Sequence, residues 1–476
     1  MRSSLPVFIL LLILATVYGL TLAPGVTWAN QGADSGDLVS AAWLGGVAHP
    51  PGYPLYLGLA WLAQRVLPGE VALRSNLLSA FFALLAALGL YAWLRRLAVS
   101  PFLAGLAALS LGLAPLVWSQ AVISEVYTLQ LFLSTLALMQ FSWGSGWFAS
   151  DLLRGVTFGL ALANHPTSLF LAPVLLFDSN SPKATRDDPR ARLLLRFAVV
   201  AMVALTLYAS LLLRGMGESP VNWGRINSFE RLLWVMRGGS YASYLTPSAS
   251  LGDKLPDLLG LLTATGWPLV LLAGLSLALL KGQATLKRLS LVLLTLHLVF
   301  GLSYATRDWQ VNLLPLFLLM AFWLGLGLAR LPDQLWPQRA GVLRWALAGL
   351  ACLSLAFATL RAWPLVDASR DRRAAEFAET ILGQAPPDSL IFTNEDRDTF
   401  ALWYYHYVLG WRPDVAVMPI GMLDYDWQRE VLRVAYPELV VPEQAEYNYR
   451  QAIIQANPAR PVCAIFVEPQ TAFLCK

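Results

Sequence analysis

Apolar residues recur along the first three quarters of the chain in stretches long enough to cross a lipid bilayer as helices. A bilayer core of about 30 Å needs roughly 20 apolar residues per helix, and this template predicts about eleven spans. The first follows a basic N-terminus, with Arg2, and resembles a secretory signal, but no small-x-small cleavage site is evident before Asn30, so we expect it to stay uncleaved. A cleaved signal would remove one crossing. The predicted spans are residues 5–24, 72–94, 100–118, 122–142, 148–163, 166–178, 194–213, 256–280, 288–305, 312–329 and 341–363.

Lysine and arginine residues between these spans predict the orientation of the chain. They cluster near residues 95–96, 183–196, 281–288 and 330–339, which all fall on one side of the membrane if the spans alternate. Because basic loops stay in the cytoplasm, the N-terminus is predicted to be cytoplasmic, and an odd number of spans then places the C-terminus outside. A count of ten or twelve spans would instead place the C-terminus in the cytoplasm.

Three stretches on the predicted outer side are too polar to cross the membrane. The first loop, residues 25–71, contains two short apolar-leaning helices that suit the membrane surface. The second is residues 215–254. In the third, residues 364–476, helical and strand-like patterns alternate, as in a small α/β domain. The sequence therefore predicts an all-α polytopic membrane domain over residues 1–363, followed by a small extracytoplasmic α/β domain.

The composition agrees with a membrane protein and excludes nucleic-acid binding. Of the 476 residues, 57% are hydrophobic and 13% are charged, and the mean hydropathy is +0.55. A soluble domain of this length would need far more charge to cover its surface. The net charge of +4 comes from scattered short clusters, so no basic stripe is available for nucleic acid.

Two of the three cysteines flank a predicted hairpin at the C-terminus. Cys463 and Cys475 bracket two strand-like runs around the turn Glu468-Pro469-Gln470-Thr471, so the two side chains should face each other. They should form a disulfide if the tail is extracytoplasmic and remain free thiols if it is cytoplasmic. Cys352 lies within an apolar span, where it should behave as a small hydrophobic residue.

Two aspartates in the first loop are the leading candidates for chemistry. Asp34 and Asp37 stand beside apolar sequence at a predicted membrane surface, where carboxylates are costly unless they have partners or a function. A carboxylate there can act as a general base toward an acceptor hydroxyl. The alternative is that Asp34-Ser35-Gly36-Asp37 forms a turn in which Asp34 caps a helix. A divalent ion, magnesium or manganese, held by these two carboxylates is also left open.

A proline-rich segment follows the two aspartates. Pro50, Pro51 and Pro54 stiffen the backbone after His49, which could donate a hydrogen bond to a phosphate or could simply be a solvated histidine on a rigid turn. The chain has 4 histidines in all. They lack the spacing of a histidine-rich metal site, so the sequence predicts no dedicated metal site of that kind.

Taken together, these motifs resemble a known family of membrane enzymes. The sequences DSGD at 34–37, HPPGYPLY at 49–56, RSNL at 74–77 and SEVY at 124–127 are similar to those of bacterial relatives of a transmembrane protein O-mannosyltransferase family within the GT-C superfamily. The resemblance runs through most of the membrane region and is weaker in the C-terminal domain. Two C-terminal motifs, DRDTF at 396–400 and GWRPD at 410–414, are familiar from bacterial members but have no assigned role.

The resemblance implies a fold, an activity and a location. It implies a GT-C-like protein of a bacterial inner membrane that transfers a sugar, with inversion, from a polyprenyl-phosphate donor to the hydroxyl of a protein or glycan acceptor. Asp34 matches the catalytic base of the first loop, with Asp37 as the second catalytic carboxylate. His49 and Pro50 match an element near the donor phosphate, and Tyr53 belongs to the same motif.

Further polar residues are predicted to converge on the outer side of the membrane. Arginines at span ends could bind the phosphate leaving group, and other polar groups open or close spans on that side. Each of them alone would more simply be an interfacial anchor or an intramembrane hydrogen-bond partner. The predicted substrate-binding residues are His49, Pro50, Tyr53, Arg74, Glu125, Tyr127, His165 and Arg307.

Two other classes of function remain in competition with the transferase. A polytopic lipid or glycan transporter or flippase would also have intramembrane charges, but the inverted repeats typical of transporters are not evident. A non-catalytic scaffold could use the aromatic residues of the tail, Trp403 to Trp411, to bind a glycan or polypeptide. At helical spacing such residues more commonly form a core.

Overall fold

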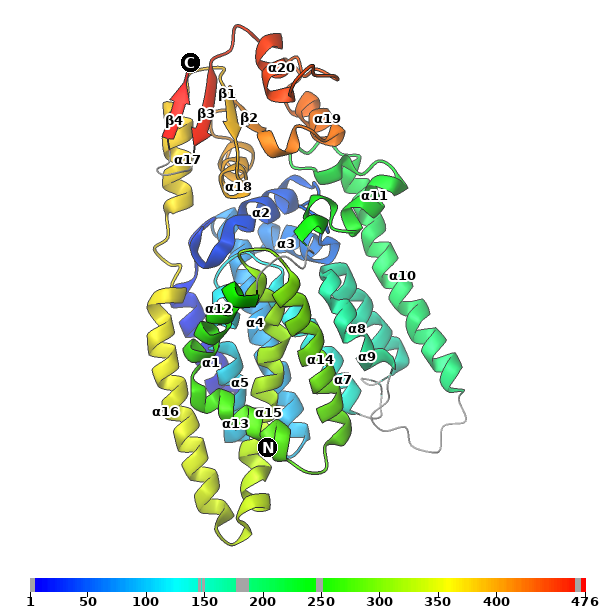
Figure 1. Ribbon diagram of the computed structural model, residues 1–476, viewed down its shortest axis with the longest axis vertical. Helices are drawn as coiled ribbons and strands as arrows, with labels where there is room; N and C mark the ends of the chain where they lie inside the picture. Colours follow the sequence, from blue (N-terminus) through cyan, green and yellow to red (C-terminus); the bar gives the residue numbers. More distant parts are fainter. Residues whose placement is uncertain (1–4, 144–146, 148–149, 177–187, 245–250, 467–471) are drawn as a thin grey trace.

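The computed structural model describes residues 5–143, 147, 150–176, 188–244, 251–466 and 472–476. The chain forms an elongated helical bundle with a small α/β domain at one end, and the C-terminus lies in that domain (Figure 1). The bundle helices are α1 (Leu5–Thr21), α4 (Val71–Arg96), α5 (Pro101–Gly112), α6 (Pro115–Ala121), α7 (Tyr127–Trp143), α8 (Asp151–Asn164), α9 (Ala172–Leu176), α10 (Pro189–Gly215), α12 (Leu251–Thr265), α13 (Trp267–Leu279), α14 (Ala284–Ser303), α15 (Leu314–Leu335) and α16 (Ala340–Val366).

Within the described residues, five helices are long and apolar enough to cross a membrane, or up to seven if each of two bent pairs is one span. Helices α5 and α6 meet at 68°, and α12 and α13 meet at 97°. The second bend falls at Gly266, whose φ of +100° suits glycine better than any other residue. The predicted spans 100–118 and 256–280 are therefore broken helices, and the count of eleven crossings stays a prediction.

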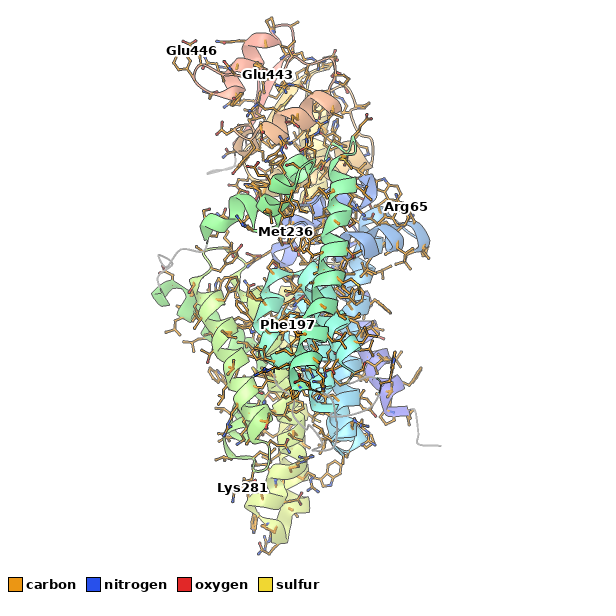
Figure 2. All side chains as sticks on the ribbon, turned by 90° about the vertical axis from the view of Figure 1, so that its right-hand side faces the viewer. Arg65, Phe197, Met236, Lys281, Glu443 and Glu446 are labelled. Atoms are coloured by element: carbon orange, nitrogen blue, oxygen red, sulfur yellow. A yellow bond between two sulfur atoms is a disulfide. The ribbon has the colours of Figure 1, made fainter. Side chains whose placement is uncertain are left out.

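The basic clusters gather at the end of the bundle that lies away from the α/β domain. Arg330 Nη2 donates to the Leu97 carbonyl at 2.8 Å, which joins the end of α15 to the end of α4. The backbone N–H of Lys281 donates to Gln334 Oε1 at 2.9 Å, which joins the α13–α14 turn to the same region. Figure 2 shows Lys281 at one tip of the molecule and Glu443 at the other. The Lys183 end of the cluster at 183–196 lies outside the described residues.

Three short helices, α2 (Ser35–Leu44), α3 (Pro54–Val66) and α11 (Phe229–Met236), lie between the bundle and the α/β domain (Figure 1). Helix α3 has the two faces expected of an interfacial helix, since Tyr56 is buried and Val66 is 70% exposed. Helix α2 does not, because residues 35–42 are all buried. The expectation that α2 rests one face in lipid is wrong, because the C-terminal domain packs over it.

The C-terminal domain contains a four-stranded sheet in the order β2-β1-β3-β4. Strand β1 pairs in parallel with β2 and β3, whereas β4 is antiparallel to β3. The predicted alternation of helix and strand is confirmed here. The elements are α17 (Arg373–Gln384), β1 (Leu390–Thr393), α18 (Asp396–Trp403), β2 (Ala416–Pro419), α19 (Asp426–Ala435), α20 (Tyr449–Ala456), β3 (Val462–Phe466) and β4 (Ala472–Cys475).

The predicted hairpin and its disulfide are confirmed. Cys463 in β3 lies directly opposite Cys475 in β4, and the two are disulfide-bonded across a Cα–Cα distance of 4.1 Å. The predicted turn at residues 468–471 lies outside the described residues. The tail aromatics are core residues rather than a binding surface, since Trp403 is 2% and Tyr404 1% exposed.

Asp371, between α16 and α17, joins the C-terminal domain to the first loop. Its Oδ2 accepts hydrogen bonds from the Thr27 hydroxyl at 2.5 Å and from the backbone N–H groups of Trp28 at 2.9 Å and Ala29 at 2.7 Å. Burial of Asp371 opposes ionisation, but these donors and the Arg373 guanidinium lower the pKa of its carboxyl to about 2. The ionised carboxylate is therefore the form that holds the loop.

We expect Asp371→Ala to loosen the first loop, because three donors lose their acceptor at once. The folded-state pKa of Asp371 lies below its ordinary value, so its contribution to stability is complete above about pH 4 and is lost as the pH falls toward 2. Limited proteolysis near neutral pH should show faster cleavage of the first loop in the variant.

The matched control is Asp424→Ala, which removes an exposed carboxylate of the same domain. It should leave the cleavage pattern unchanged. Equal protection of the loop in Asp371→Ala and in the unmodified chain would contradict the role given to Asp371.

Candidate functional site

The carboxylate of Asp37 organises a group of buried side chains beneath the C-terminal domain. Asp37 is in the first turn of α2 and is fully buried. Its Oδ2 accepts from the backbone N–H of His49 at 2.8 Å and from His49 Nδ1 at 2.7 Å, and its Oδ1 accepts from Trp223 Nε1 at 3.0 Å. Both oxygens are thus engaged in fixing His49 and Trp223. This geometry differs from the expectation that Asp37 is a second catalytic carboxylate in reach of substrate.

Asp34, unlike Asp37, is partly exposed to solvent. It occupies the position just before α2, but its side chain makes no capping hydrogen bond, which argues against the helix-cap alternative. The side chain is 34% exposed, and its Oδ2 lies 3.7 Å from His49 Nε2. The structure thus leaves one carboxylate of the motif accessible and beside an imidazole.

Gly36 explains how the C-terminal domain reaches this motif. A Cβ at Gly36 would overlap the backbone carbonyl of Phe400 in α18, so only glycine lets α18 lie directly on α2. The Phe400 ring stands nearly parallel to the His49 ring at 6.3 Å between centroids. Gly36 of this motif therefore allows α18 to pack over the segment that contains Asp34 and Asp37.

The charges around Asp34 and His49 set their protonation. Burial raises the pKa of Asp34, the neighbouring carboxylates of Asp308, Asp396 and Asp37 raise it further, and His49 lowers it, with a result of about 7. Burial lowers the pKa of His49, but Asp34 and Asp37 outweigh that effect and raise it to about 9. At neutral pH, His49 is a cation, while Asp34 is poised to take up a proton.

A series of rings continues from His49 toward the bundle. The hydroxyl of Tyr53 lies 3.1 Å from His49 Nε2. The Tyr53 ring stacks on His165 at 5.9 Å, and His165 lies 5.6 Å from the Tyr127 ring. The structure therefore brings His49 and Tyr53, which share one motif, together with Tyr127 and His165, which lie elsewhere in the sequence.

Three other predicted site residues, Glu125, Pro50 and Arg307, differ in their burial and contacts. Glu125 is 4% exposed, and its charge contributes to the raised pKa of His49. Pro50 packs against Gly239, where a Cβ would collide with the proline ring. Arg307 is exposed and immediately precedes Asp308, whose carboxylate influences Asp34.

Arg74 lies outside the site. Its Nε donates to the Gly69 carbonyl at 2.9 Å and its Nη1 donates to the Gln64 carbonyl, so its guanidinium fastens the turn between α3 and α4. The prediction that Arg74 binds the donor phosphate therefore finds no support in its position. The cation next to Asp34 is His49 instead.

Three side chains of the site have no role in the sequence prediction. The Tyr241 ring lies 5.6 Å from His49, and the Trp223 ring lies 6.3 Å from it. The hydroxyl of Tyr241 donates to Asp396 Oδ2 at 3.1 Å. The DRDTF motif that contains Asp396 is recognisable in the sequence, but no local pattern connects it, Trp223 or Tyr241 with the first loop.

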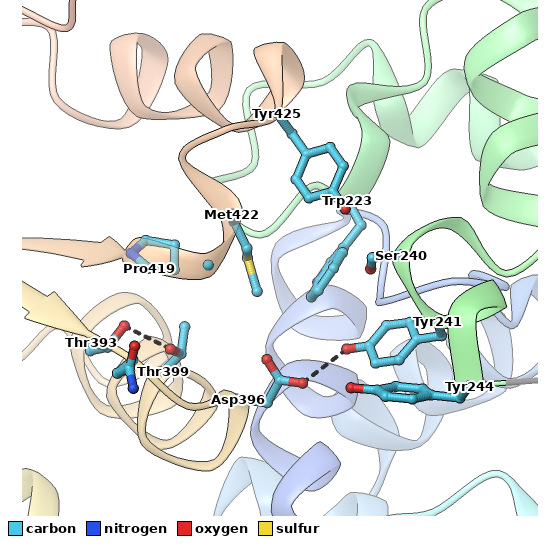
Figure 3. Close-up of a pocket in the computed structure, with 12 residues that line it drawn as sticks. Trp223, Ser240, Tyr241, Tyr244, Thr393, Asp396, Thr399, Pro419, Met422 and Tyr425 are labelled. Carbon is cyan, nitrogen blue, oxygen red and sulfur yellow. Dashed lines mark hydrogen bonds between the residues drawn. The ribbon is translucent and has the colours of Figure 1, made fainter. Parts of the chain in front are cut away.

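A cavity of about 140 Å³ adjoins this centre between the C-terminal domain and the segment 223–244 (Figure 3). Trp223 and Tyr241 form part of its wall, so the cavity and His49 share these two rings. The remaining lining residues are Ser240, Tyr244, Thr393, Asn394, Asp396, Thr399, Pro419, Gly421, Met422 and Tyr425.

The first-loop carboxylates do not fit a divalent metal ion. Both oxygens of Asp37 already accept hydrogen bonds from N–H donors, and the cationic His49 lies between the two aspartates. Among the residues that the structure describes, no group of three or more histidine, cysteine, aspartate or glutamate side chains could hold a metal ion.

Family models and individual proteins that match this sequence carry the same name, TMEM260. The family model of the protein O-mannosyl-transferase TMEM260 N-terminal domain matches residues 34–179, and that of TMEM260-associated domain 2 matches residues 374–454. The mouse protein O-mannosyl-transferase TMEM260 is 28% identical over 463 residues, which cover 90% of this chain. The chain spans 64% of that relative's length. A Dictyostelium discoideum protein of the same name is 29% identical over 132 residues, 27% of this chain and 16% of that protein.

The fold is that of a solved membrane protein. The crystal structure of ArnT from Cupriavidus metallidurans bound to undecaprenyl phosphate superposes with a TM-score of 0.63 at 13% sequence identity. The match covers 98% of this chain and 93% of that one, so both the bundle and the C-terminal domain share the arrangement. The chain is thus similar in sequence to the TMEM260 protein O-mannosyl-transferases, and it has the fold of ArnT.

Proposed function

We propose that this protein is an integral-membrane glycosyltransferase that moves a sugar, with inversion, from a polyprenyl-phosphate donor to an acceptor hydroxyl. One observation carries the proposal: Asp34 is an accessible carboxylate with a pKa near 7, 3.7 Å from a cationic histidine, at the junction of an apolar bundle and a polar domain. A general base works best when its pKa lies near the working pH. The family relationship and the bound undecaprenyl phosphate of ArnT support the same substrate class.

In the proposed reaction, the acceptor oxygen attacks the anomeric carbon while the bond from that carbon to the phosphate oxygen breaks. Asp34 takes the acceptor proton, and the electron pair of the broken bond leaves with polyprenyl phosphate. The imidazolium of His49 stabilises the charge that develops on the phosphate, and the exposed guanidinium of Arg307 is a second cation for it. Asp37 keeps His49 oriented and protonated.

We also propose that the site faces the extracytoplasmic side of a bacterial inner membrane, with the N-terminus in the cytoplasm. The basic clusters gather at the end of the bundle opposite the C-terminal domain, as they would on a cytoplasmic face. The disulfide of the β3–β4 hairpin favours an oxidising compartment for that domain. On this orientation the donor enters from the outer leaflet and the acceptor from the aqueous side.

We expect Asp34→Asn to abolish sugar transfer, because the amide cannot accept the acceptor proton. Loss of a general base typically lowers the rate about 10²- to 10⁴-fold. The measurement is release of radiolabelled sugar from a polyprenyl-phosphate mannose by purified protein in lipid nanodiscs, with water or an added alcohol as acceptor.

Asp257→Asn is the matched control, since it changes an exposed carboxylate of α12. It should retain the activity of the unmodified chain. Full activity of Asp34→Asn would refute the assignment of the base, and no sugar release by the unmodified chain with any polyprenyl-linked donor would refute the proposed function.

The pH dependence of transfer should be bell-shaped. Asp34 must lose its proton to act as base, so activity rises through about pH 7; His49 must keep its proton, so activity falls through about pH 9. Because the two groups interact, these limbs belong to the pair. Initial rates in the nanodisc assay, measured from about pH 5.5 to about pH 10 so that both limbs are covered, test this profile.

His49→Gln should lower the rate, remove the alkaline limb and move the acidic limb to higher pH, because the charge of His49 lowers the pKa of Asp34. A profile of the variant with both limbs intact would show that a group other than His49 titrates near pH 9.

A further inference from the structure

The cavity beside His49 lies where open α/β sheets commonly bind ligands. Thr393 and Pro419 are the last residues of the parallel strands β1 and β2, and both line the cavity. Ligands of α/β folds bind outside the carboxyl ends of parallel strands, where loops diverge. The C-terminal domain therefore contributes the ends of β1 and β2 to a pocket that adjoins His49.

One wall of the pocket is aromatic and the opposite wall is polar. Tyr241 lies 5.9 Å from Tyr244 and 6.0 Å from Trp223 between ring centroids, and Tyr425 extends this wall. Figure 3 shows the hydroxyls of Tyr241 and Tyr244 pointing toward Asp396, with Tyr241 hydrogen-bonded to it. Aromatic faces pack against apolar C–H groups, while polar groups opposite them bind hydroxyls.

The charge of the lining selects against anions. Asp396 carries a carboxylate, and none of the described residues that line the pocket is a lysine or arginine. One oxygen of Asp396 accepts from Tyr241, and the residue remains exposed, so it can accept further hydrogen bonds. The exposed amide of Asn394 adds donors and an acceptor. Such a lining suits a neutral ligand with several hydroxyl groups.

The pocket is poorly suited to an extended polypeptide. A peptide that adds to a sheet needs the free edge of a strand for main-chain hydrogen bonds. This pocket lies at the carboxyl ends of β1 and β2 and not along the free edge of β2, which is the outer strand of the sheet. A compact polyhydroxylated ring, by contrast, presents an apolar face to the aromatic wall and hydroxyls to Asp396 and Asn394.

The position of the pocket relative to Asp34 identifies which ligand it holds. Trp223 and Tyr241 contact both the pocket and His49, so a ligand there lies next to the reacting groups. The pocket is formed by the C-terminal domain and the segment 223–244, away from the apolar bundle through which a lipid carrier arrives. We propose that this pocket binds a neutral sugar ring of the acceptor, so that the transferase extends a glycan; this inference rests on the proposed function.

The test measures binding to the full chain in nanodiscs, without donor. The probe is methyl α-mannopyranoside, observed by saturation-transfer NMR and titrated for a dissociation constant, with a neutral serine- and threonine-containing peptide as the alternative probe. We expect the glycoside to bind, and Tyr244→Ala and Asn394→Ala each to weaken binding about tenfold, since each removes one wall contact worth about 1.4 kcal/mol. Both side chains are exposed, so these variants should fold.

The matched control is Tyr447→Ala, which removes a tyrosine that is 81% exposed elsewhere in the same domain. It should bind the glycoside like the unmodified chain. Binding of the peptide in place of the glycoside, or glycoside binding that neither pocket variant weakens, would overturn the proposal.

A kinetic measurement separates this proposal from the proposed function. Sugar release to water in the absence of acceptor tests the transferase chemistry alone, whereas glycoside binding tests the pocket alone. In transfer to the glycoside, Tyr244→Ala should raise KM for the acceptor. A raised KM for the polyprenyl-linked donor with an unchanged acceptor KM would assign the pocket to the transferred sugar and overturn the acceptor assignment.

Discussion

The site depends on one buried ion pair, that of Asp37 with His49. A carboxylate without exposure to water is stable only if it is paired and hydrogen-bonded, and here both oxygens are satisfied by His49 and Trp223. The pair fixes the first loop to the segment that contains Trp223. It also keeps a positive charge beside Asp34, in a region where several carboxylates would otherwise repel one another.

The C-terminal domain completes the site rather than merely extending the chain. Its helix α18 lies on α2 because Gly36 has no side chain, and this contact brings Phe400 over His49 and Asp396 near Asp34. Asp371 reinforces the same arrangement from the other end of the first loop. Partial burial is the largest cause of the raised pKa of Asp34, and the neighbouring carboxylates add to it.

The same arrangement fits the proposed function, in which one site serves a lipid-linked and a water-soluble substrate. The apolar bundle lies on one side of α2, the helix that Asp34 precedes, and the polar C-terminal domain with its pocket lies on the other side (Figure 1). The proposed reaction would need no nucleotide-binding fold, because the bond broken in the proposed donor already joins sugar and phosphate. For that proposed reaction, Asp34 and His49 are the base and the cation that the structure places side by side.

Local patterns in the sequence determined the apolar helices, the order of helices and strands in the tail, the Cys463–Cys475 hairpin and the motif containing Asp34, because each depends on residues close together in the chain. Tertiary structure alone decided that Asp37 is a buried anchor, that Arg74 fastens a turn, and that Asp396 and Tyr241 join the site. Asp37 and Trp223 are 186 residues apart, and Tyr241 and Asp396 are 155 apart. Periodicity and spacing carry no information at such separations, since these contacts arise only when α2, the segment 223–244 and α18 pack together.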